Sequence, residues 1–512
     1  MERGEGLAPR RAIWRPPDYC WALLGLVALA LIHKTSPQRL EGHWLVLTPV
    51  LVFAGVLLAR RLWEAPPAVT FCIALALRIF SGAWAQIGLG GLPLDRLAIL
   101  LALAQVFLYA PGAASLPPLR LRNVHLLMLA MVLYLVASAA AAGTLTSNYS
   151  IQALVDEFGV APYLGFLIAP AVFVGERERG WLLATLVGVG LYLGATAVFE
   201  AVGPHGLVWP AYIAEIDSID PSGRVNGPFQ GSVAEGCAAF ACAVAALIAF
   251  GRWRGLRRRY FAAAAVALCL FACFATLERG VWIAAIAAAL VAAATSRSTR
   301  RLIVPALAIG AILLGGVLVA SESLSSKASD RVGDERSIWD RKNQTAAGVR
   351  MIEAKPLFGF GLDRYKDDSL EYFRQTEDYP MSGRSAGELL GEPEIVQPLH
   401  NLYLSYGVEL GLVGGLLWLA TLVWGLGAAI FAKGPSWAAP WKQGLLALVT
   451  FFLVVTFVNP QQPPFISLLL WTWAGVALGP VAVRPAAARE SRAGSRFAAS
   501  ASALEPAPWP RP

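Results

Sequence analysis

Residues 397–419, with the sequence QPLHNLYLSYGVELGLVGGLLWL, join a long polar stretch to an unbroken apolar run. We expect this run to form a helix over residues 400–432, which is longer than the roughly 20 residues that cross a bilayer. His400, one of five histidines in the chain, and Asn401 stand at its entrance. The segment therefore predicts a membrane helix whose first turn carries polar side chains.

The composition of the whole chain is that of a polytopic membrane protein. Of its 512 residues, 57% are hydrophobic and 15% are charged, whereas soluble domains carry about 25% charged residues. The first apolar run follows a basic stretch, as in a signal peptide, but lacks a convincing cleavage site, which favours an uncleaved anchor. We predict an all-α fold of about 14 transmembrane helices, near residues 19–33, 44–59, 67–88, 95–110, 123–142, 158–175, 181–203, 231–250, 260–277, 280–295, 302–321, 400–432, 443–459 and 465–480.

The basic residues predict the orientation of these helices. With both termini in the cytoplasm, runs such as GRWRGLRRR (251–259) and SRSTRR (296–301) fall on the cytoplasmic side, and the short outer loops hold few cations. This is the positive-inside pattern, and it puts His400 on the outer side. The net charge of +8 then reflects topology. It does not indicate a nucleic-acid partner, because the basic runs lack interleaved aromatic residues.

The spacing of apolar and polar runs divides the chain into seven parts. The outer loop before His400 is the longest, and its segment 335–356 has the spacing of an amphipathic helix. We expect Ile338, Ala346, Val349 and Ile352 to form its apolar stripe, and Pro356 to help end it. The parts are a cytoplasmic basic N-terminal tail (1–18), N-terminal transmembrane helices (19–203), an outer loop (204–230), central transmembrane helices (231–321), a large, partly helical outer cap loop (322–399), C-terminal transmembrane helices (400–480) and a disordered cytoplasmic tail (481–512).

His400 is the candidate proton acceptor. The partial positive charge of a helix N-terminus disfavours an imidazolium, so a neutral imidazole would be able to take a proton near neutral pH. Asn401 beside it would orient a hydroxyl group or the ring. The alternative is a polar pair that caps a helix at the membrane interface.

Three arginines on the predicted outer side are candidates for phosphate binding. Arg224 lies in SGRVNGPFQGS, Arg279 in the turn TLERGVWIA, and Arg341 in the cap helix. A guanidinium group presents a rigid fork of donors that matches phosphate oxygens. Arginines from separate loops that meet near one histidine would suit a diphosphate leaving group. The alternative for each is a loop carboxylate or a snorkelling position at the interface.

Two further charges fall inside apolar runs. Glu409 lies nine residues after His400, and Arg78 lies in CIALALRIF. An intramembrane charge needs a partner or a wet cavity and is a functional candidate by default. The sequence leaves open whether either residue contacts substrate or only steadies the helices.

Metal chemistry has little support in the sequence. The six cysteines lie in or beside apolar runs without accompanying histidines or carboxylates, so we interpret them as small buried residues. The acidic cluster Glu215, Asp217 and Asp220 could bind a metal, but a solvated loop is the simpler interpretation. We expect no metal and no cofactor.

Four segments together resemble the O-antigen ligase/polymerase superfamily of bacterial inner-membrane enzymes. GRVNGPF resembles its Arg-x-x-Gly-x-Phe segment, and TLERGVW its Ser-Arg-Gly turn, with Glu278 where serine is usual. The cap segment from Arg341 through PLFGFG resembles its loop pattern. HNLYLSYGVELG, the most specific match, resembles His-Asn-x-Tyr-Leu followed by Glu-x-Gly, with Tyr403 as the tyrosine and Glu409 as the acid. The resemblance covers roughly residues 220–430.

This resemblance implies a metal-independent inverting glycosyltransferase with a GT-C-like arrangement of helices. His400, Arg224 and Arg341 would be catalytic, and Arg279, Asn401, Tyr403, Glu409 and Arg78 would bind substrate. The donor would be a glycan on undecaprenyl diphosphate, and the acceptor a glycan or lipid A-core. The enzyme would work on the periplasmic face of the bacterial inner membrane, among membrane lipids and with polysaccharide chain-length and export proteins as possible partners.

Three functions remain distinct at this stage. A polymerase would extend a lipid-linked O-antigen, capsule or exopolysaccharide, and the extra N-terminal spans favour it. A ligase would move finished glycan to lipid A-core or a protein. A lipid-linked oligosaccharide flippase also spans the membrane many times, but it would show charges scattered through many spans and short outer loops.

Overall fold

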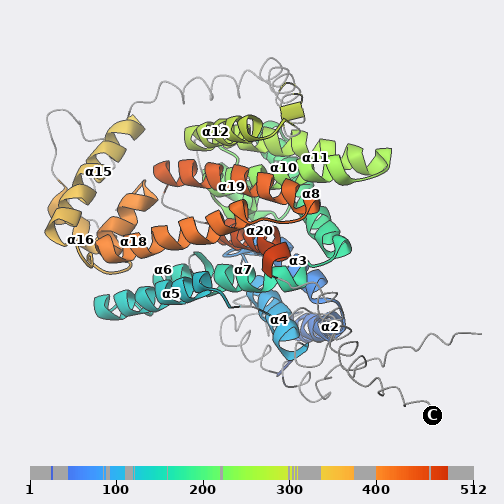
Figure 1. Cartoon of the computed structure of the whole chain (residues 1–512), viewed down its shortest axis with the longest axis horizontal. Coiled ribbons are helices and arrows are strands. Elements are labelled where there is room, and N and C mark those ends of the chain that lie inside the picture. The colour runs from blue at the N-terminus through green and yellow to red at the C-terminus, as the bar shows by residue number, and fades with distance from the viewer. Residues whose placement is uncertain are drawn as a thin grey trace, which may run out of the picture.

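The computed structural model describes residues 44–84, 86–87, 93–109, 121–157, 159–219, 223–297, 336–373, 399–459 and 463–482, with a few single residues between them. Within these residues the regular elements are all helical (Figure 1). The α-helices are α2 (Trp44–Trp63), α3 (Pro67–Leu77), α4 (Leu94–Tyr109), α5 (Asn123–Ala142), α6 (Asn148–Gln152), α7 (Val160–Val172), α8 (Glu176–Val202), α9 (Tyr212–Ile219), α10 (Ser232–Arg252), α11 (Leu256–Ala275), α12 (Arg279–Thr295), α15 (Arg336–Ala354), α16 (Tyr365–Asp368), α18 (Leu402–Phe431), α19 (Ala439–Val458) and α20 (Pro464–Ala482).

The helices have the lengths and surfaces of a polytopic membrane protein. Among the described residues, seven helical segments are long and apolar enough to cross a membrane, and three shorter apolar helices accompany them. Large apolar side chains also point outward from the bundle, such as Leu126 and Leu133 on α5, which are 61% and 59% exposed. An apolar outer face of this kind fits lipid and not water. The predicted spans at 19–33 and 302–321 lie almost entirely outside the described residues, so the count of about 14 stays a prediction.

One predicted span is shorter than the hydropathy suggested. The sequence predicted a helix over 67–88, but α3 ends at Leu77, and a single 3-10 turn (Arg78–Phe80) follows it. Ser81 leaves the helical region with ψ of 123°, and Gly82 has φ of +93°. A positive φ angle ends a helix and favours glycine. The chain therefore turns at Gly82, within a run that hydropathy alone predicts to be one continuous helix.

Close packing of small residues explains the cysteines. A Cβ atom at Gly190 on α8 would lie 2.8 Å from the sulfur of Cys269 and 2.9 Å from Cβ of Cys242. The five cysteines in the described residues are buried and form no disulfide. Their interpretation as small core residues is therefore confirmed for those five, while Cys20 lies outside the described residues.

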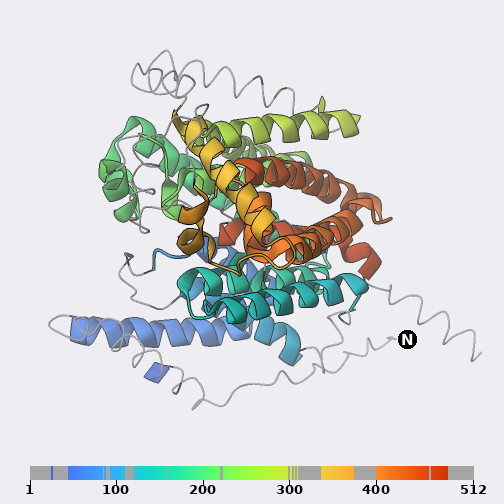
Figure 2. The same ribbon diagram turned by 90° about the vertical axis from the view of Figure 1, so that its left-hand side faces the viewer.

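The cap lies at one end of the bundle. Helices α15 and α16 sit beside the start of α18 on the left of Figure 1, and α15 crosses that end in front of the other helices in Figure 2. A small apolar core joins the cap to α18 through buried Met351, Tyr365, Leu399 and Val408. The expected cap helix 335–356 is thus found as α15, and it ends before Pro356 as predicted.

The predicted apolar stripe of α15 is right at Ile352, which packs against the core of the cap, and wrong at Val349. Val349 is 43% exposed, whereas Ala347 and Met351 are fully buried. Two polar residues, Asn343 and Gln344, share the buried face and are 3% and 4% exposed. The pattern of apolar residues alone misplaced this face, because it contains polar side chains that bond within the protein.

A backbone clamp fixes the cap to α18. Gly411 breaks that helix with φ of 66° and ψ of −170°, which frees backbone groups for partners outside it. The N–H groups of Phe360 and Gly361 donate to the carbonyl groups of Val408 and Glu409 at 2.9 and 2.8 Å. In the other direction, the N–H groups of residues 412 and 413 donate to the carbonyl groups of residues 356 and 357 at 2.8 and 3.1 Å. The segment PLFGFG is therefore paired with the break in α18.

Candidate active site

His400 lies one residue before the N-cap of α18, and its ring is bonded to the cap. The Nδ1 atom of His400 lies 2.7 Å from Oε1 of Gln344 on α15. An amide oxygen only accepts hydrogen bonds, so Nδ1 carries the proton and Nε2 keeps its lone pair. The ring is partly exposed, whereas Gln344 is buried. When the imidazole is neutral, this bond selects the tautomer that can accept a proton at Nε2.

Three arginines from separate segments lie near one another, and two of them interact with the carboxylate of Glu278. Nη1 of Arg224 lies 2.7 Å from Oε1 of Glu278, and Oγ of Ser232 donates to the same oxygen at 2.8 Å. Arg341 interacts electrostatically with Glu278, Arg279 and Arg224: burial lowers the pKa of its guanidinium group, the carboxylate raises it, and the other two arginines lower it further. The structure brings together the three arginines that the sequence singled out.

The cap helix connects this arginine group to the histidine. Arg341 and Gln344 are three residues apart on α15, and residues at that spacing share one face of a helix. The same face therefore presents a guanidinium group to the arginine group and an amide to His400. The arginine group and the ring of His400 are therefore linked through one face of α15.

A buried carboxylate holds the loop that carries Arg224. Oε2 of Glu200, at the end of α8, accepts hydrogen bonds from the backbone N–H groups of Asn226 and Gly227 at 3.0 and 3.2 Å. Gly227 has φ of 57°, and a Cβ atom there would lie 2.0 Å from Oε2 of Glu235. Only glycine fits this turn, which explains why the segment around Arg224 needs one.

Residues 264–419 match the family model described as O-antigen ligase. This segment is similar to an O-antigen ligase domain. This domain runs from within α11 to within α18 and includes Arg279, Arg341 and His400, whereas Arg224 lies ahead of it. A comparison with curated proteins gave no match. The family implies a membrane glycosyltransferase that uses lipid-linked glycans.

Other predicted site residues of the O-antigen ligase domain have structural partners. The side chain of Asn401 caps α18 by accepting the N–H of Leu404 at 3.1 Å. The hydroxyl group of Tyr403 donates to the carbonyl group of Leu453 on α19 at 3.0 Å, and its ring packs on Trp418. Neither residue is bonded to His400 through these contacts, so their predicted role in substrate binding stays a prediction.

Glu409 belongs to the clamp between the cap and α18. It is 3% exposed, and its carboxylate accepts hydrogen bonds from the backbone N–H groups of Asp363 and Tyr365. The contacts indicate that this acidic residue of the O-antigen ligase domain positions the cap segment after PLFGFG. The sequence had left a structural role and a substrate-binding role open for Glu409.

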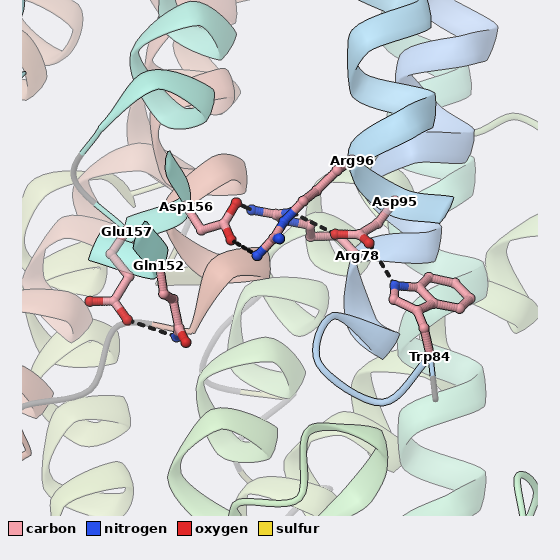
Figure 3. A network of polar contacts seen from close by, with 7 residues as sticks. All are labelled: Arg78, Trp84, Asp95, Arg96, Gln152, Asp156 and Glu157. Atoms are coloured by element: carbon pink, nitrogen blue, oxygen red, sulfur yellow. Dashed lines mark hydrogen bonds and ion pairs between the residues drawn. The ribbon is translucent and has the colours of Figure 1, made fainter. Parts of the chain in front are cut away.

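Arg78 lies in a separate buried ion network (Figure 3). Its guanidinium group pairs with Asp95, at 2.5 Å, and with Asp156, while Arg96 also reaches Asp156 at 2.5 Å. Nε1 of Trp84 donates to the other oxygen of Asp95 at 2.6 Å. None of the other predicted site residues is among the partners of Arg78 in the described chain, so the structure does not join it to the histidine and arginine group.

The described residues contain no group of three or more His, Cys, Asp or Glu side chains that could hold a metal ion. Of the acidic cluster in the outer loop, Asp220 lies outside the described residues. No sequence motif marks Gln344 or Glu200, because each is a lone amide or acid in an otherwise helical stretch. Their roles become visible only in the folded chain, where both side chains are buried.

Proposed function

We propose that the protein is an inverting glycosyltransferase that moves a glycan from undecaprenyl diphosphate to a sugar hydroxyl at the periplasmic face of the bacterial inner membrane. The observation that carries this proposal is the bond between His400 and Gln344 beside Arg341. This arrangement places a neutral base near a positively charged site for an anion. Such a transfer needs both.

The arginine group would receive the diphosphate of the donor. Arg224 and Arg341 interact with the one carboxylate of Glu278, and Arg279 lies within electrostatic reach of Arg341, so the group keeps excess positive charge for phosphate oxygens. As the bond between the anomeric carbon and the diphosphate oxygen breaks, negative charge grows on the leaving group. Fixed cations in a partly buried site stabilise that charge, and this supports a transfer that needs no metal ion.

His400 would activate the acceptor. The acceptor hydroxyl gives its proton to Nε2 while its oxygen attacks the anomeric carbon from the face opposite to the diphosphate. The anomeric centre inverts, and undecaprenyl diphosphate leaves. A positioned base of this kind contributes roughly 10²–10⁴-fold to a rate, and the clamped cap would supply the positioning of both reactants.

We favour polymerisation of a surface polysaccharide, namely O-antigen, capsule or exopolysaccharide, over ligation to lipid A-core or protein, because of the N-terminal helices ahead of the O-antigen ligase domain. The size profile of lipid-linked and surface glycans in cells that lack the protein separates the two. Single repeat units without long chains would support the polymerase. Long chains stranded on undecaprenyl diphosphate would support the ligase instead.

A further inference from the structure

A cavity of about 640 Å³ lies between α8 and the segment where α10 passes into α11. Its lining begins at the first turn of α8, around Glu176. The other end of α8 carries Glu200, which holds the Arg224 loop. The 27 residues of α8 span about 40 Å, so the cavity lies at the opposite end of the bundle from the arginine group. The basic residues predict that this end is cytoplasmic.

The mouth of the cavity is rich in guanidinium groups. The lining includes one carboxylate, Glu176, which is 85% exposed and lies 3.2 Å from Nη2 of Arg252. Guanidinium groups match phosphate oxygens in geometry and stay charged at any working pH. The positive charge of the mouth therefore suits a phosphate group. The arginines that line the cavity are Arg177, Arg179, Arg252 and Arg258.

One of these arginines is fixed in place. Arg179 is 6% exposed, and its guanidinium group lies 3.6 Å from the ring centre of Trp437. Its Nη1 donates to the carbonyl groups of Phe173 and Val174. These contacts place a fixed positive charge in the wall of the cavity. A bound phosphate ester would be held by the exposed guanidinium groups of Arg177 and Arg258 beside it.

An apolar track leads from this mouth along α8. Gly180, Ala184, Gly188 and Leu191 recur on one face of the helix and line the cavity. A Cβ atom at Gly180 or Gly188 would meet nothing within 4 Å, so the track is open. From Gly180 to Leu191 the helix rises about 16 Å, which is close to half of the roughly 30 Å hydrocarbon core. The track therefore has the length of one membrane leaflet.

We propose that this cavity binds an anionic glycerophospholipid of the adjacent leaflet, with its phosphate among the arginines and one acyl chain along the apolar track. Basic pockets between membrane helices on the cytoplasmic side suit such headgroups. Free phosphate shares the headgroup chemistry, but it would leave the apolar track unused. The site is separate from the candidate active site and does not depend on the proposed reaction.

Titration of the full-length protein in detergent with phosphatidylglycerol, followed by native mass spectrometry, tests this proposal. We expect Arg177→Gln combined with Arg258→Gln to weaken binding about 25-fold, from roughly fivefold for each surface arginine. The matched control is Arg254→Gln combined with Arg297→Gln, which removes two exposed arginines of the same predicted side that do not line the cavity. The control should bind as the unaltered protein does.

A second variant tests the track without changing any charge. Gly188→Leu should weaken phosphatidylglycerol binding about tenfold, through the lost contact of roughly two methylene groups, and excess inorganic phosphate should not displace the lipid. Equal affinities of the cavity variant and its charge-matched control would overturn the site. Unchanged binding by Gly188→Leu, or displacement by inorganic phosphate, would overturn the assignment to a lipid.

Discussion

The Nδ1 atom of His400 lies 2.7 Å from the amide oxygen of Gln344, a residue 56 positions earlier in the chain. This bond fixes the tautomer that leaves a lone pair at Nε2. Gln344→Ala should therefore lower kcat for glycan transfer by roughly 10-fold to 100-fold, because the ring loses its orientation but keeps its basic nitrogen.

The neighbouring substitution Thr345→Ala is the control for this prediction. Thr345 is exposed, and its hydroxyl group donates only to the backbone of its own helix, at Arg341. Its kcat should stay near that of the unaltered protein. A Gln344→Ala protein with unchanged kcat would show that the cap does not orient the base.

Glu278 is bonded to Arg224 at 2.7 Å, so on the proposed function it would compete with the donor diphosphate for that guanidinium group. Glu278→Gln removes the carboxylate charge from the arginine group, so the KM for the lipid-linked donor should fall severalfold as the attraction for diphosphate rises. Glu278→Ser, which restores the residue usual in the resembling family, should stay active. A higher KM in both variants would mean that Glu278 is needed to aim Arg224 and does not compete with the donor.

The break in α18 at Gly411 requires glycine. Its φ is +66°, and a Cβ atom would lie 2.4 Å from the carbonyl oxygen of Leu357. Gly411→Ala should release the cap, expose residues 356–373 to limited proteolysis and lower transfer by roughly 100-fold through misplacement of α15. Gly415→Ala on the same helix is the control, because a Cβ atom there meets nothing within 4 Å. Equal protease resistance of the two variants would rule out the clamp.

The buried network in Figure 3 is predicted to stabilise the fold and not to act on substrate. Arg78→Leu leaves the buried carboxylate of Asp95 without a cationic partner and that of Asp156 with Arg96 alone, which should lower the free energy of unfolding by about 3–5 kcal/mol. Arg96→Gln removes a half-exposed partner of Asp156 and should cost about 1 kcal/mol or less. Thermal unfolding in detergent compares the two, and equal midpoints would contradict the assignment.

Much of this architecture could be predicted from sequence, because bilayer thickness and the cost of buried charge act on composition directly. Hydropathy found α5 at the same bounds as the structure, 123–142. It also singled out Arg78 as a residue that needs partners. The break at Gly411 escaped prediction, because the φ angle of a glycine inside an apolar run is set by the chain that packs against it.

The candidate site divides in the same way. Motif residues such as Arg224 and His400 could be chosen because their chemistry is scarce in a membrane protein. Gln344 could not, since its role depends on a contact between two distant helices. Val349 was misplaced for a related reason: the face of α15 that packs inward carries amides, and the apolar pattern could not reveal it.

The most direct measurement is the rate of undecaprenyl diphosphate release by purified protein in nanodiscs, with lipid-linked glycan as donor and acceptor and with EDTA present. The unaltered protein should turn over, and His400→Ala should bind donor normally but react roughly 10²–10⁴-fold more slowly, as expected for a missing general base. Release by His400→Ala at the unaltered rate would contradict the role of His400, and loss of all activity in EDTA would contradict transfer without a metal.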